Sequence, residues 1–473
     1  MVVGQVADPV DLLIAGAGPG GYAAALRGAQ LGRRVTLVDR DGTDGVGGVC
    51  LRVGCIPSKA LIEVAELAAR IGDAGQFGLD ARLDRFDMTR FQTWKGGVVD
   101  KLCNGVRGLL KSAGVDIVAG ELRLTGPDGA IVNPVDGQAR FLTFKDLILA
   151  TGSRPTALAD LPFDGKRVLD STGALAMAAI PKRLAIVGAG YIGLEIGTAF
   201  AKLGSQVTMI EVEDRILPAM DPQIARPVAR NLDRLGIKVL LGARALGHAK
   251  GKIAIAVGGT ERMVAADTVV IAVGRMPNGD DLGLDAAGLE TGAGGLLAVA
   301  ADRRLAPHIA AIGDLTPGPA LAHKATAEAA VAVEALSGKR AAFAPAAIPA
   351  VVFSDPEIAT AGLTAAEAAD QGMETQVATV PLSVSGRAAT LGAGRGFAQI
   401  VADKADGTVV GVHLTGPHAS ELIGEGVLAI EMGATLEDLA LAIHAHPTLS
   451  EQWGEAADLA LGRPLHMSLA GGA

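Results

Sequence analysis

The sequence predicts an α/β protein in which two similar units are followed by a different, α+β domain. First, an order of apolar strand, glycine-rich turn, alanine-rich helix and second apolar strand begins at Asp11 and again at Arg183. Second, this pattern gives way after residue 347 to strands followed by helices, without a glycine-rich turn. Third, a chain of 473 residues is too long for a single core and is expected to form three or four domains.

Each of the two similar units carries glycines at the spacing G-x-G-x-x-G and an acid at the end of its second strand. These residues are Gly16, Gly18, Gly21 and Asp39 in the first unit, and Gly188, Gly190, Gly193 and Glu211 in the second. The first glycine permits a tight turn, the second lets the backbone approach a pyrophosphate, and the third lets the helix pack closely on the strand. The pyrophosphate lies over the helix N-terminus, and the acid binds a ribose hydroxyl. Two complete copies therefore predict two Rossmann-like dinucleotide-binding domains.

The acid of the second unit also indicates which nicotinamide cofactor binds there. Glu211 is followed by Glu213 and Asp214, and this negative charge repels a 2′-phosphate. Arg215 adds one opposing positive charge. We therefore expect NAD rather than NADP in the second unit.

The segments that follow the two units also resemble each other. "DLILATGSRP" (146–155) and "TVVIAVGRMPN" (268–278) are apolar strands that close on a glycine, and we expect them to connect the domains. A glycine-rich connection over 279–296 then leads to a short strand that ends at Gly313–Asp314. An acid at such a strand end can bind a sugar hydroxyl of the first cofactor. Standing alone, Asp314 would equally be an ordinary turn residue.

Two of the chain's three cysteines lie close together in "GGVCLRVGCIPSK" (47–59). Residues five apart on a regular helix point about 140° away from each other, so a bonded Cys50–Cys55 pair requires a helix break, for which Gly54 is suited. Pro57 suits the first turn of a following helix. That helix would place Cys55 at its N-terminus, where the dipole stabilises a thiolate. The alternative is two small core residues, the usual place of a free cysteine.

The composition argues against several classes of function. The net charge is −9 at pH 7 with no long run of one sign, which argues against a nucleic-acid partner. No apolar run approaches the ~18 residues of a membrane helix, and the N-terminus lacks the basic region of a secretory signal. Three cysteines in a chain of this length indicate a reducing compartment, where a close pair favours redox chemistry. We expect a cytoplasmic protein that binds neither nucleic acid nor membrane.

The dinucleotide sites and the cysteine pair fit one redox reaction. A nicotinamide carries two electrons as hydride, a disulfide accepts two electrons, and a flavin mediates between them, so we expect FAD in one site and NAD in the other. Exchange with an incoming dithiol also needs a base near neutral pH. "AIHAHPTLSEQW" (442–453) offers His444 or His446, with Glu451 as the carboxylate that orients the ring. Spacing does not choose between the histidines, and either one alone would more often be an ordinary capping or core residue.

Six segments together resemble the FAD-dependent disulfide oxidoreductases, and the resemblance covers nearly the whole chain. They are "GGVCLRVGCIPSK", "ATGSRP", "AVGRMPN", "AIGD", "LAHKA" and "HAHPTLSE". Within this family, the chain is most similar to members that oxidise dihydrolipoamide on a partner protein and reduce NAD⁺. The resemblance implies that electrons pass from the dithiol to a Cys50–Cys55 disulfide and then through the flavin to the nicotinamide. It also implies a homodimer.

The resemblance assigns roles to individual residues. Cys50 would be the thiol that meets the substrate, and Cys55 would be the thiolate at the flavin. Lys59 would lie near the flavin and pair with Glu195. The implied FAD-binding residues are Gly16, Gly18, Gly21, Asp39, Lys59, Thr151, Gly152, Gly313, Asp314 and Ala322. The implied NAD-binding residues are Gly188, Gly190, Gly193, Glu211 and Gly274.

The same resemblance implies how the active site is completed and how the chain divides. His446, oriented by Glu451, would be the acid–base group and would come from the other subunit, so that a monomer lacks a complete site. The chain offers no room before Gly16 for a lipoyl domain, so we expect the lipoyl arm on another protein. The implied parts are an FAD-binding domain with the redox disulfide (1–154), an NAD-binding domain (155–275), a return to the FAD domain (276–346) and a dimerisation domain (347–473).

The chain departs from the family pattern at few positions. Val49 and Arg52 stand where Thr and Asn are frequent, and Asp39 replaces a frequent Glu. Arg52 adds a charge near the disulfide, which would shift its reduction potential. Tyr191, inside the second glycine motif, either covers the flavin when NAD is absent or merely packs. Cys103 has no cysteine nearby in the sequence and is expected to be inert.

Two alternative functions differ from this expectation. A glutathione-reductase-like enzyme would use NADPH and carry basic residues around Glu211. Mercuric reductases and the larger thioredoxin reductases need C-terminal cysteines, which "HMSLAGGA" lacks. A non-catalytic flavoprotein scaffold is the second alternative. It is disfavoured by the joint presence of Cys50, Cys55, His446 and Glu451.

Overall fold

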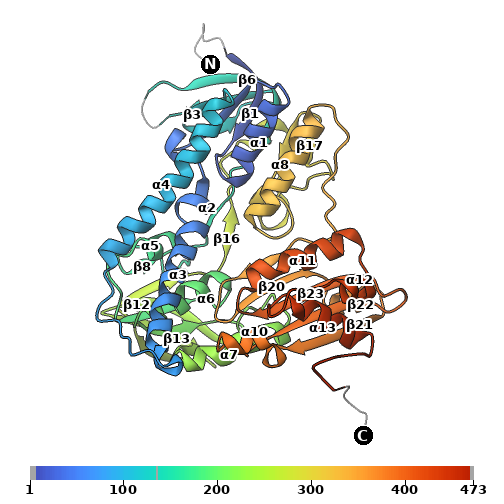
Figure 1. The fold of residues 1–473 in the computed structure, drawn as a ribbon. Helices are drawn as coiled ribbons and strands as arrows, with labels where there is room; N and C mark the ends of the chain where they lie inside the picture. Colours follow the sequence, from blue (N-terminus) through green and yellow to red (C-terminus); the bar gives the residue numbers. More distant parts are fainter. Residues whose placement is uncertain (1–6, 135–136, 469–473) are drawn as a thin grey trace.

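The computed structural model describes residues 7–134 and 137–468, which form three regions around separate sheets (Figure 1). The first sheet has the strand order β17-β18-β6-β1-β2-β3, and the β4–β5 hairpin extends from β6. β1 lies parallel to β2 and β6, and its second half, residues 12–15, is buried on both faces, as expected when helices cover a parallel sheet. The strands are β1 (Asp8–Ala15), β2 (Val35–Asp39), β3 (Asp116–Ala119), β4 (Glu121–Leu124), β5 (Gly129–Asn133), β6 (Arg140–Leu149), β17 (Arg304–Ala306) and β18 (Ile309–Ala311).

Two helices that are far apart in the sequence lie side by side on this first sheet (Figure 1). α1 (Pro19–Gln30) follows the first glycine-rich turn, and Pro19 starts it at a position where no helical N–H bond is needed. α8 (Ala322–Leu336) follows β18, which lies parallel to β6. The chain therefore returns to its N-terminal sheet after passing through the second unit.

The second sheet repeats the arrangement of the first, with the order β11-β10-β9-β15-β8 and all pairs parallel. An antiparallel sheet of β12, β13 and β14 precedes β15. These elements are β8 (Val168–Leu169), β9 (Arg183–Val187), α6 (Tyr191–Lys202), β10 (Gln206–Ile210), α7 (Pro222–Arg234), β11 (Lys238–Leu240), β12 (Ala243–Ala249), β13 (Lys252–Val257), β14 (Thr260–Ala265) and β15 (Thr268–Ile271).

The two units are joined by a small antiparallel sheet and by a helix. β7 (Ser153–Pro155) pairs with β16 (Arg275–Pro277), so the two predicted connecting segments bond to each other. α2 (Gly48–Arg52), α3 (Cys55–Gly72) and α4 (Met88–Ser112) extend from the first unit toward the second (Figure 1). α3 packs against α6, where its Leu61 and Ala65 share a buried core with Leu194 and Phe200. The helix that begins at Cys55 thus connects the cores of the two units.

The C-terminal region is an antiparallel sheet with helices, which confirms the predicted α+β domain. The strand order is β19-β20-β23-β22-β21. Trp453 of α13 is 1% exposed and packs in the core that this sheet forms with its helices. The elements are β19 (Ala350–Val352), β20 (Glu357–Gly362), β21 (Thr375–Pro381), β22 (Phe397–Asp403), β23 (Val409–Gly416), α11 (Ala419–Met432), α12 (Leu436–Leu441) and α13 (Glu451–Ala460).

The remaining elements are short. The α-helices are α5 (Ser171–Leu175), α9 (Ala365–Asp370) and α10 (Gly386–Thr390). The 3-10 helices are η1 (Gly42–Gly45), η2 (Ala74–Phe77), η3 (Leu284–Ala287), η4 (Ala293–Gly295), η5 (Gly313–Leu315) and η6 (Leu382–Val384). Within 7–134 and 137–468, no helix is both long and apolar enough to cross a membrane.

Candidate active site

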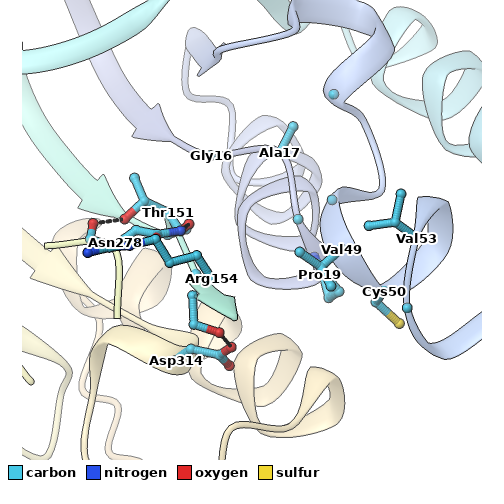
Figure 2. A pocket seen from close by; sticks show the side chains of 18 of the residues that line it. Gly16, Ala17, Pro19, Val49, Cys50, Val53, Thr151, Arg154, Asn278 and Asp314 are labelled. Atoms are coloured by element: carbon cyan, nitrogen blue, oxygen red, sulfur yellow. Dashed lines mark hydrogen bonds between the residues drawn. The ribbon is translucent and has the colours of Figure 1, made fainter. Parts of the chain in front are cut away.

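A cavity of about 1090 Å³ is lined by the first glycine-rich turn and by the start of α3, and its far wall holds η5 (Figure 2). Cys50 of α2 lies beside the turn, and Thr151 and Asp314 lie across from it (Figure 2). The predicted FAD-binding residues that line the cavity are Gly16, Gly18, Asp39, Lys59, Thr151, Gly152, Gly313, Asp314 and Ala322. Gly21 is not among the lining residues and instead packs beneath the turn.

The first glycine-rich turn leaves no space for a side chain at its first and third glycines. Gly16 has φ +100°, and a Cβ added there would lie 2.4 Å from the carbonyl oxygen of Ala150. A Cβ at Gly21 would lie 1.7 Å from the carbonyl oxygen of Gly16. Asp39 accepts hydrogen bonds from the amides of Ala17 at 2.9 Å and Asp41 at 3.1 Å. The turn therefore presents backbone without side chains at its glycines, which fits the pyrophosphate of FAD. Asp39 at the edge of the cavity fits a ribose hydroxyl.

The second glycine-rich turn repeats this geometry, and its three glycines do not line the cavity. Gly188 has φ +101°, and a Cβ there would lie 2.4 Å from the carbonyl oxygen of Ala272. A Cβ at Gly193 would lie 2.0 Å from the carbonyl oxygen of Gly188. Glu211 accepts a hydrogen bond from the amide of Ala189 at 2.6 Å. The predicted NAD-binding residues form this second turn and its surroundings: Gly188, Gly190, Gly193, Glu211 and, at φ +125°, Gly274.

The charge around Glu211 favours a cofactor without a 2′-phosphate. The amide of Glu213 donates to Glu211 at 3.0 Å, so the chain bends back over the acid. The Arg215 guanidinium, which was the one opposing feature of the sequence, donates to the carbonyl of Pro218 at 2.9 Å. This arrangement fits NAD better than NADP.

The helix break predicted between the two cysteines is present. α2 ends at Arg52, Gly54 adopts φ −130° and ψ −102°, and α3 begins at Cys55. Pro57 lies in the first turn of α3, also as predicted. Cys50 and Cys55 are free thiols in the structure, which corresponds to the dithiol form of the predicted redox pair.

The two thiols differ strongly in acidity. A hydrogen bond from Cys50 lowers the pKa of Cys55 to about 7; burial opposes the shift and the Lys59 charge adds to it. The pKa of Cys50 is raised, because its proton is held in the bond to Cys55 and because the thiol is buried. The helix N-terminus gives further support to a Cys55 thiolate. Cys55 is therefore the thiolate of the pair near neutral pH, and Cys50 keeps its proton.

A charged pair links the cysteine helix to the second unit and to the C-terminal region. Lys59 Nζ donates to Glu195 Oε2 at 2.8 Å, which is the pairing that the resemblance implied. Glu195 is 4% exposed and also accepts from the amide of Phe353 at 3.1 Å. The Lys59 ammonium lies 4.3 Å from the centre of the Phe353 ring. No sequence motif pointed to Phe353, because it lies in a segment that was interpreted only as a domain boundary.

The connecting segments contribute a polar network to the far wall of the cavity. Asp314 accepts a hydrogen bond from Ser153 Oγ at 2.5 Å, and Arg275 Nε donates to the same hydroxyl at 2.8 Å. Thr151 Oγ1 donates to the carbonyl of Asn278 at 2.8 Å, and the Asn278 amide donates back to the Thr151 carbonyl at 2.9 Å (Figure 2). Ser153, Arg275 and Asn278 were absent from the predicted site. All three lie in the motifs "ATGSRP" and "AVGRMPN", so these motifs could have indicated them as site residues.

The two candidate bases have different environments. His446 Nδ1 lies 2.8 Å from Glu451 Oε1, and 79% of its side chain is exposed. His444 Nε2 lies 2.7 Å from Glu425 Oε1, and 11% of its side chain is exposed. Burial raises the pKa of Glu451, but the Thr448 amide and the His446 ring outweigh it, so the pKa is lowered and the carboxylate stays charged.

The thiols and the histidine–glutamate pair are not brought together within one chain. Cys50 and Cys55 line the cavity, whereas His446 and Glu451 lie in the C-terminal region and do not contribute to its lining. Ile443, close to the pair, is 100% exposed, as is expected where a second subunit packs.

Comparison with known families identifies the chain. The family model of the pyridine nucleotide-disulphide oxidoreductases matches residues 10–329, and the model of their dimerisation domain matches residues 348–457. The chain belongs to the pyridine nucleotide-disulphide oxidoreductase family.

Individual relatives agree with this assignment. The chain is 45% identical to the dihydrolipoyl dehydrogenase of Geobacillus stearothermophilus, over 99% of each chain. It is 46% identical to the dihydrolipoyl dehydrogenase of Halobacterium salinarum, over 98% of this chain and 99% of the relative. Among solved structures, LpdA from Mycobacterium tuberculosis superposes with a TM-score of 0.88 at 28% identity, covering 95% of this chain and 99% of LpdA.

Membership of the pyridine nucleotide-disulphide oxidoreductases confirms the resemblance, the fold class and the homodimer that the sequence predicted. The departures from the family pattern are accommodated locally. Arg52 pairs with Asp41 at 3.0 Å, so its charge is partly balanced beside the cavity. Cys103 is 3% exposed in α4 and does not line the cavity. Tyr191 lines the cavity and is 42% exposed. Partial desolvation of its hydroxyl by the surrounding chain raises the pKa of Tyr191.

Proposed function

We propose that this protein oxidises dihydrolipoamide carried by another protein and reduces NAD⁺. The observation that carries the proposal is the Cys50–Cys55 pair on the wall of the cavity, with Cys55 acidified to a pKa of about 7. Full-length relatives at 45% and 46% identity are dihydrolipoyl dehydrogenases, which supports the substrate. The cofactors are FAD and NAD, as the sequence led us to expect.

The thiol chemistry follows from the acidity of the two cysteines. A substrate thiolate attacks Sγ of Cys50 in the disulfide form, which breaks the Cys50–Cys55 bond and releases the Cys55 thiolate. A low thiol pKa makes Cys55 a good leaving group. The second substrate sulfur then attacks the mixed disulfide, closes the substrate's own disulfide and releases Cys50, whose sulfur takes a proton. The substrate thus loses two electrons and two protons, and the overall reaction yields NADH and one proton.

The remaining residues bind the cofactors or move protons. Bound FAD supplies a two-electron relay between the dithiol and the nicotinamide. The glycine-rich turns hold the two pyrophosphates, with Asp39 and Glu211 at the ribose hydroxyls. Asp314, Thr151, Gly152, Gly313 and Ala322 bind the rest of FAD, and Lys59 with Glu195 places a compensated charge beside Cys55. The domain division at 154, 275 and 346 remains part of this proposal.

The histidine that serves as the base comes from the second subunit. His446 is exposed, it is paired with Glu451, and it lies outside the cavity that holds the thiols. The buried His444 is held by Glu425, which favours a structural role for it. We therefore place His446 and Glu451 of one subunit at the Cys50–Cys55 pair of the other. The imidazole takes the proton of the incoming dithiol, and the Glu451 carboxylate stabilises the imidazolium.

The partner is a lipoyl-bearing protein of a multienzyme complex such as a 2-oxo acid dehydrogenase or the glycine cleavage system. The cytoplasm is the proposed compartment, because three cysteines with one close pair suit a reducing environment. A glutathione-reductase-like activity has less support, since Glu211 is surrounded by acidic residues and Arg215 is bound to Pro218.

Steady-state NADH formation from dihydrolipoamide tests the proposal. We expect turnover with NAD⁺ and little with NADP⁺, and a lower KM for the dithiol when it is attached to a lipoyl-bearing protein. The Cys50→Ser variant separates the enzyme from a flavoprotein scaffold, because it should bind FAD and lose turnover. Absence of turnover in FAD-loaded protein, with reduction of glutathione disulfide by NADPH instead, would contradict the proposal.

A further inference from the structure

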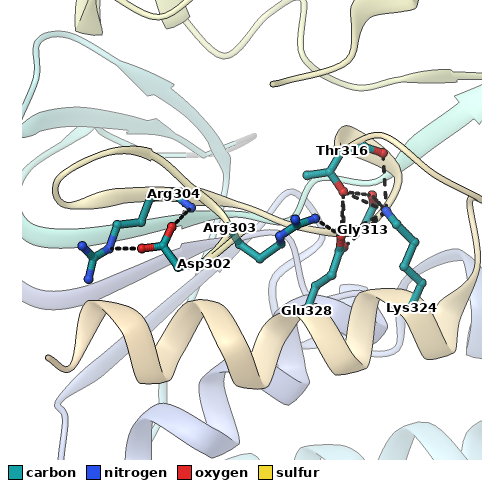
Figure 3. A network of polar contacts seen from close by, with 7 residues as sticks. All are labelled: Asp302, Arg303, Arg304, Gly313, Thr316, Lys324 and Glu328. Carbon is teal, nitrogen blue, oxygen red and sulfur yellow. Dashed lines mark hydrogen bonds and ion pairs between the residues drawn. The ribbon is translucent and has the colours of Figure 1, made fainter. Parts of the chain in front are cut away.

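A buried ion network lies directly behind the far wall of the cavity (Figure 3). Glu328 of α8 is 0% exposed and lies within 3.2 Å of Lys324 Nζ and 2.9 Å of Arg303 Nη1. Lys324 is 2% exposed. Burying three charges is unfavourable unless they are paired and hydrogen-bonded. Lys324 lies in the "LAHKA" motif, of which the proposed function uses only Ala322.

The network forms hydrogen bonds with both ends of one short segment, residues 313–316. Glu328 Oε2 accepts from the amide of Gly313 at 2.6 Å, and Lys324 Nζ donates to the carbonyl of the same residue at 3.0 Å. Thr316 Oγ1 lies 2.8 Å from Lys324 Nζ and 3.0 Å from Glu328 Oε1, and Thr316 is 1% exposed. The ends of the segment 313–316 are therefore bound to the same two buried charges (Figure 3).

Two residues at this network have a positive φ. Gly313 has φ +73°, and a Cβ there would lie 3.2 Å from the Cβ of Ala325. Arg303, which brings the second cation, has φ +68°, a region that non-glycine residues rarely adopt. Conformations of this kind persist where the surroundings determine them, and they gather at functional sites. Asp314, the one acid of the segment, faces the cavity and accepts from Ser153 at 2.5 Å.

We propose that Lys324, Glu328 and Thr316 are positioning residues that hold Asp314 in place for FAD. The inference rests on the proposed FAD site. Two points favour a positioning role over simple stabilisation. In the described part of the chain, the neutral groups that hydrogen-bond the side chains of Lys324 and Glu328 all belong to the segment 313–316. Asp314 is the residue of that segment that lines the cavity with a charged side chain. The network therefore contributes to FAD retention without touching the cofactor.

The rate of FAD release tests this role, and it is measured from the rise in flavin fluorescence after dilution of the FAD-loaded dimer. Thr316→Val removes the hydroxyl at nearly constant shape, and we expect about a 10-fold faster release, since a buried hydrogen bond to a charged group is lost. Thr316→Ser keeps the hydroxyl and should stay within about twofold of wild type. Glu328→Gln should release FAD faster than Thr316→Val, because it weakens several bonds at once.

Asp146→Asn is the matched control for loss of stability. Asp146 pairs with Arg33 at 2.6 Å, with side chains 9% and 12% exposed, in the same sheet and away from the cavity. We expect a lower melting temperature and an unchanged rate of FAD release. A double-mutant cycle adds a second readout: in an Asp314→Ala background, Thr316→Val should add less than about threefold, because no acid remains to be positioned.

Three results would overturn the inference. Thr316→Val and Glu328→Gln could release FAD at the wild-type rate, Asp146→Asn could accelerate release equally, or the Thr316→Val effect could persist in full without Asp314. Wild-type protein that binds no FAD at all would instead overturn the proposed cofactor site, and this inference with it.

Discussion

The two glycine-rich units bind their strand-end acids by the same kind of hydrogen bond, but the surroundings of their glycine turns differ. Asp39 accepts from the amide of Ala17 at 2.9 Å, and Glu211 accepts from that of Ala189 at 2.6 Å. A Cβ added at Gly18 would lie 4.0 Å from Gly48 of α2, whereas nothing lies within 4 Å of a Cβ at Gly190.

The surroundings extend this difference. The first turn forms part of a cavity of about 1090 Å³, with Cys50 and Cys55 on one side and the segment 313–316 on the other. The three glycines of the second turn do not line that cavity, although Tyr191 and Ile192 between them do. The same G-x-G-x-x-G motif therefore lies in two settings. The first turn, on the wall of the cavity, suits a cofactor that stays bound. The second turn, whose glycines lie outside the cavity, suits a cofactor that enters and leaves at each turnover.

The largest expected effect comes from removing Cys55, a reactive thiol of the first unit that has no counterpart in the second. Cys55→Ser should reduce NADH formation from dihydrolipoamide by about 10³-fold or more, because the reacting sulfur is removed, while FAD content stays unchanged. Cys103→Ser is the control, since Cys103 is buried in α4 and outside the cavity. Equal losses in both variants would mean that the assay reports stability rather than thiol chemistry.

The base should have the next largest effect. We expect His446→Gln to lower kcat/KM for the dithiol by roughly 10²–10³-fold, the range of general acid–base catalysis. Hybrid dimers test whether His446 acts on the thiols of the other subunit. Random pairing of Cys55→Ser and His446→Gln subunits should recover roughly a quarter of wild-type activity, because each hybrid keeps one complete site. No recovery in verified hybrids would place the base and the thiols in the same chain.

The glycine pair tests the comparison itself. Gly16→Ala and Gly188→Ala introduce the same strain, since both residues have φ near +100° and both added Cβ atoms lie 2.4 Å from a carbonyl oxygen. We expect Gly16→Ala to weaken FAD binding by about 10-fold or more. Gly188→Ala should retain FAD and raise the KM for NAD⁺ by a similar factor. Loss of FAD from both variants, at matched melting temperatures, would refute separate roles for the two turns.

The smallest expected effect concerns pH. In the dithiol form, Cys55 should be protonated below a pH of about 7 and a thiolate above it, as its lowered pKa requires. Its ultraviolet thiolate absorbance, measured against the Cys55→Ser protein, should rise through that pH. Lys59→Met removes a charge that lowers this pKa and should move the midpoint upward, toward the ordinary 9.0. An unchanged midpoint would show that Lys59 does not act on the thiol.

The part of the site that the sequence predicted is local along the chain. The glycine turns, their acids and the break between Cys50 and Cys55 depend on backbone geometry over a few residues, which spacing captures. His446 and Glu451 are five residues apart and could be paired by spacing, whereas Glu425, the partner of His444, lies 19 residues away and could not.

The part that could not be predicted depends on contacts between distant segments. Ser153 and Asp314 are 161 residues apart, and Phe353 and Glu195 are 158 apart. Their meeting is set by how the connecting strands and the C-terminal region pack, for which a single sequence carries no local signal. The redox pairing of Cys50 with Cys55 was implied by resemblance, and the structure has both as free thiols. The choice of His446 over His444 also came from resemblance, and exposure now supports it.

A single-turnover measurement tests the central claim most directly. FAD-loaded dimer is mixed without oxygen with a known, limiting amount of dihydrolipoamide, and NAD⁺ is then added in excess. We predict one NADH for each dithiol consumed, and none from the Cys50→Ser protein. Consumption of the dithiol without NADH, or equal NADH from Cys50→Ser, would contradict the account that the Cys50–Cys55 pair passes the electrons of the dithiol to NAD⁺.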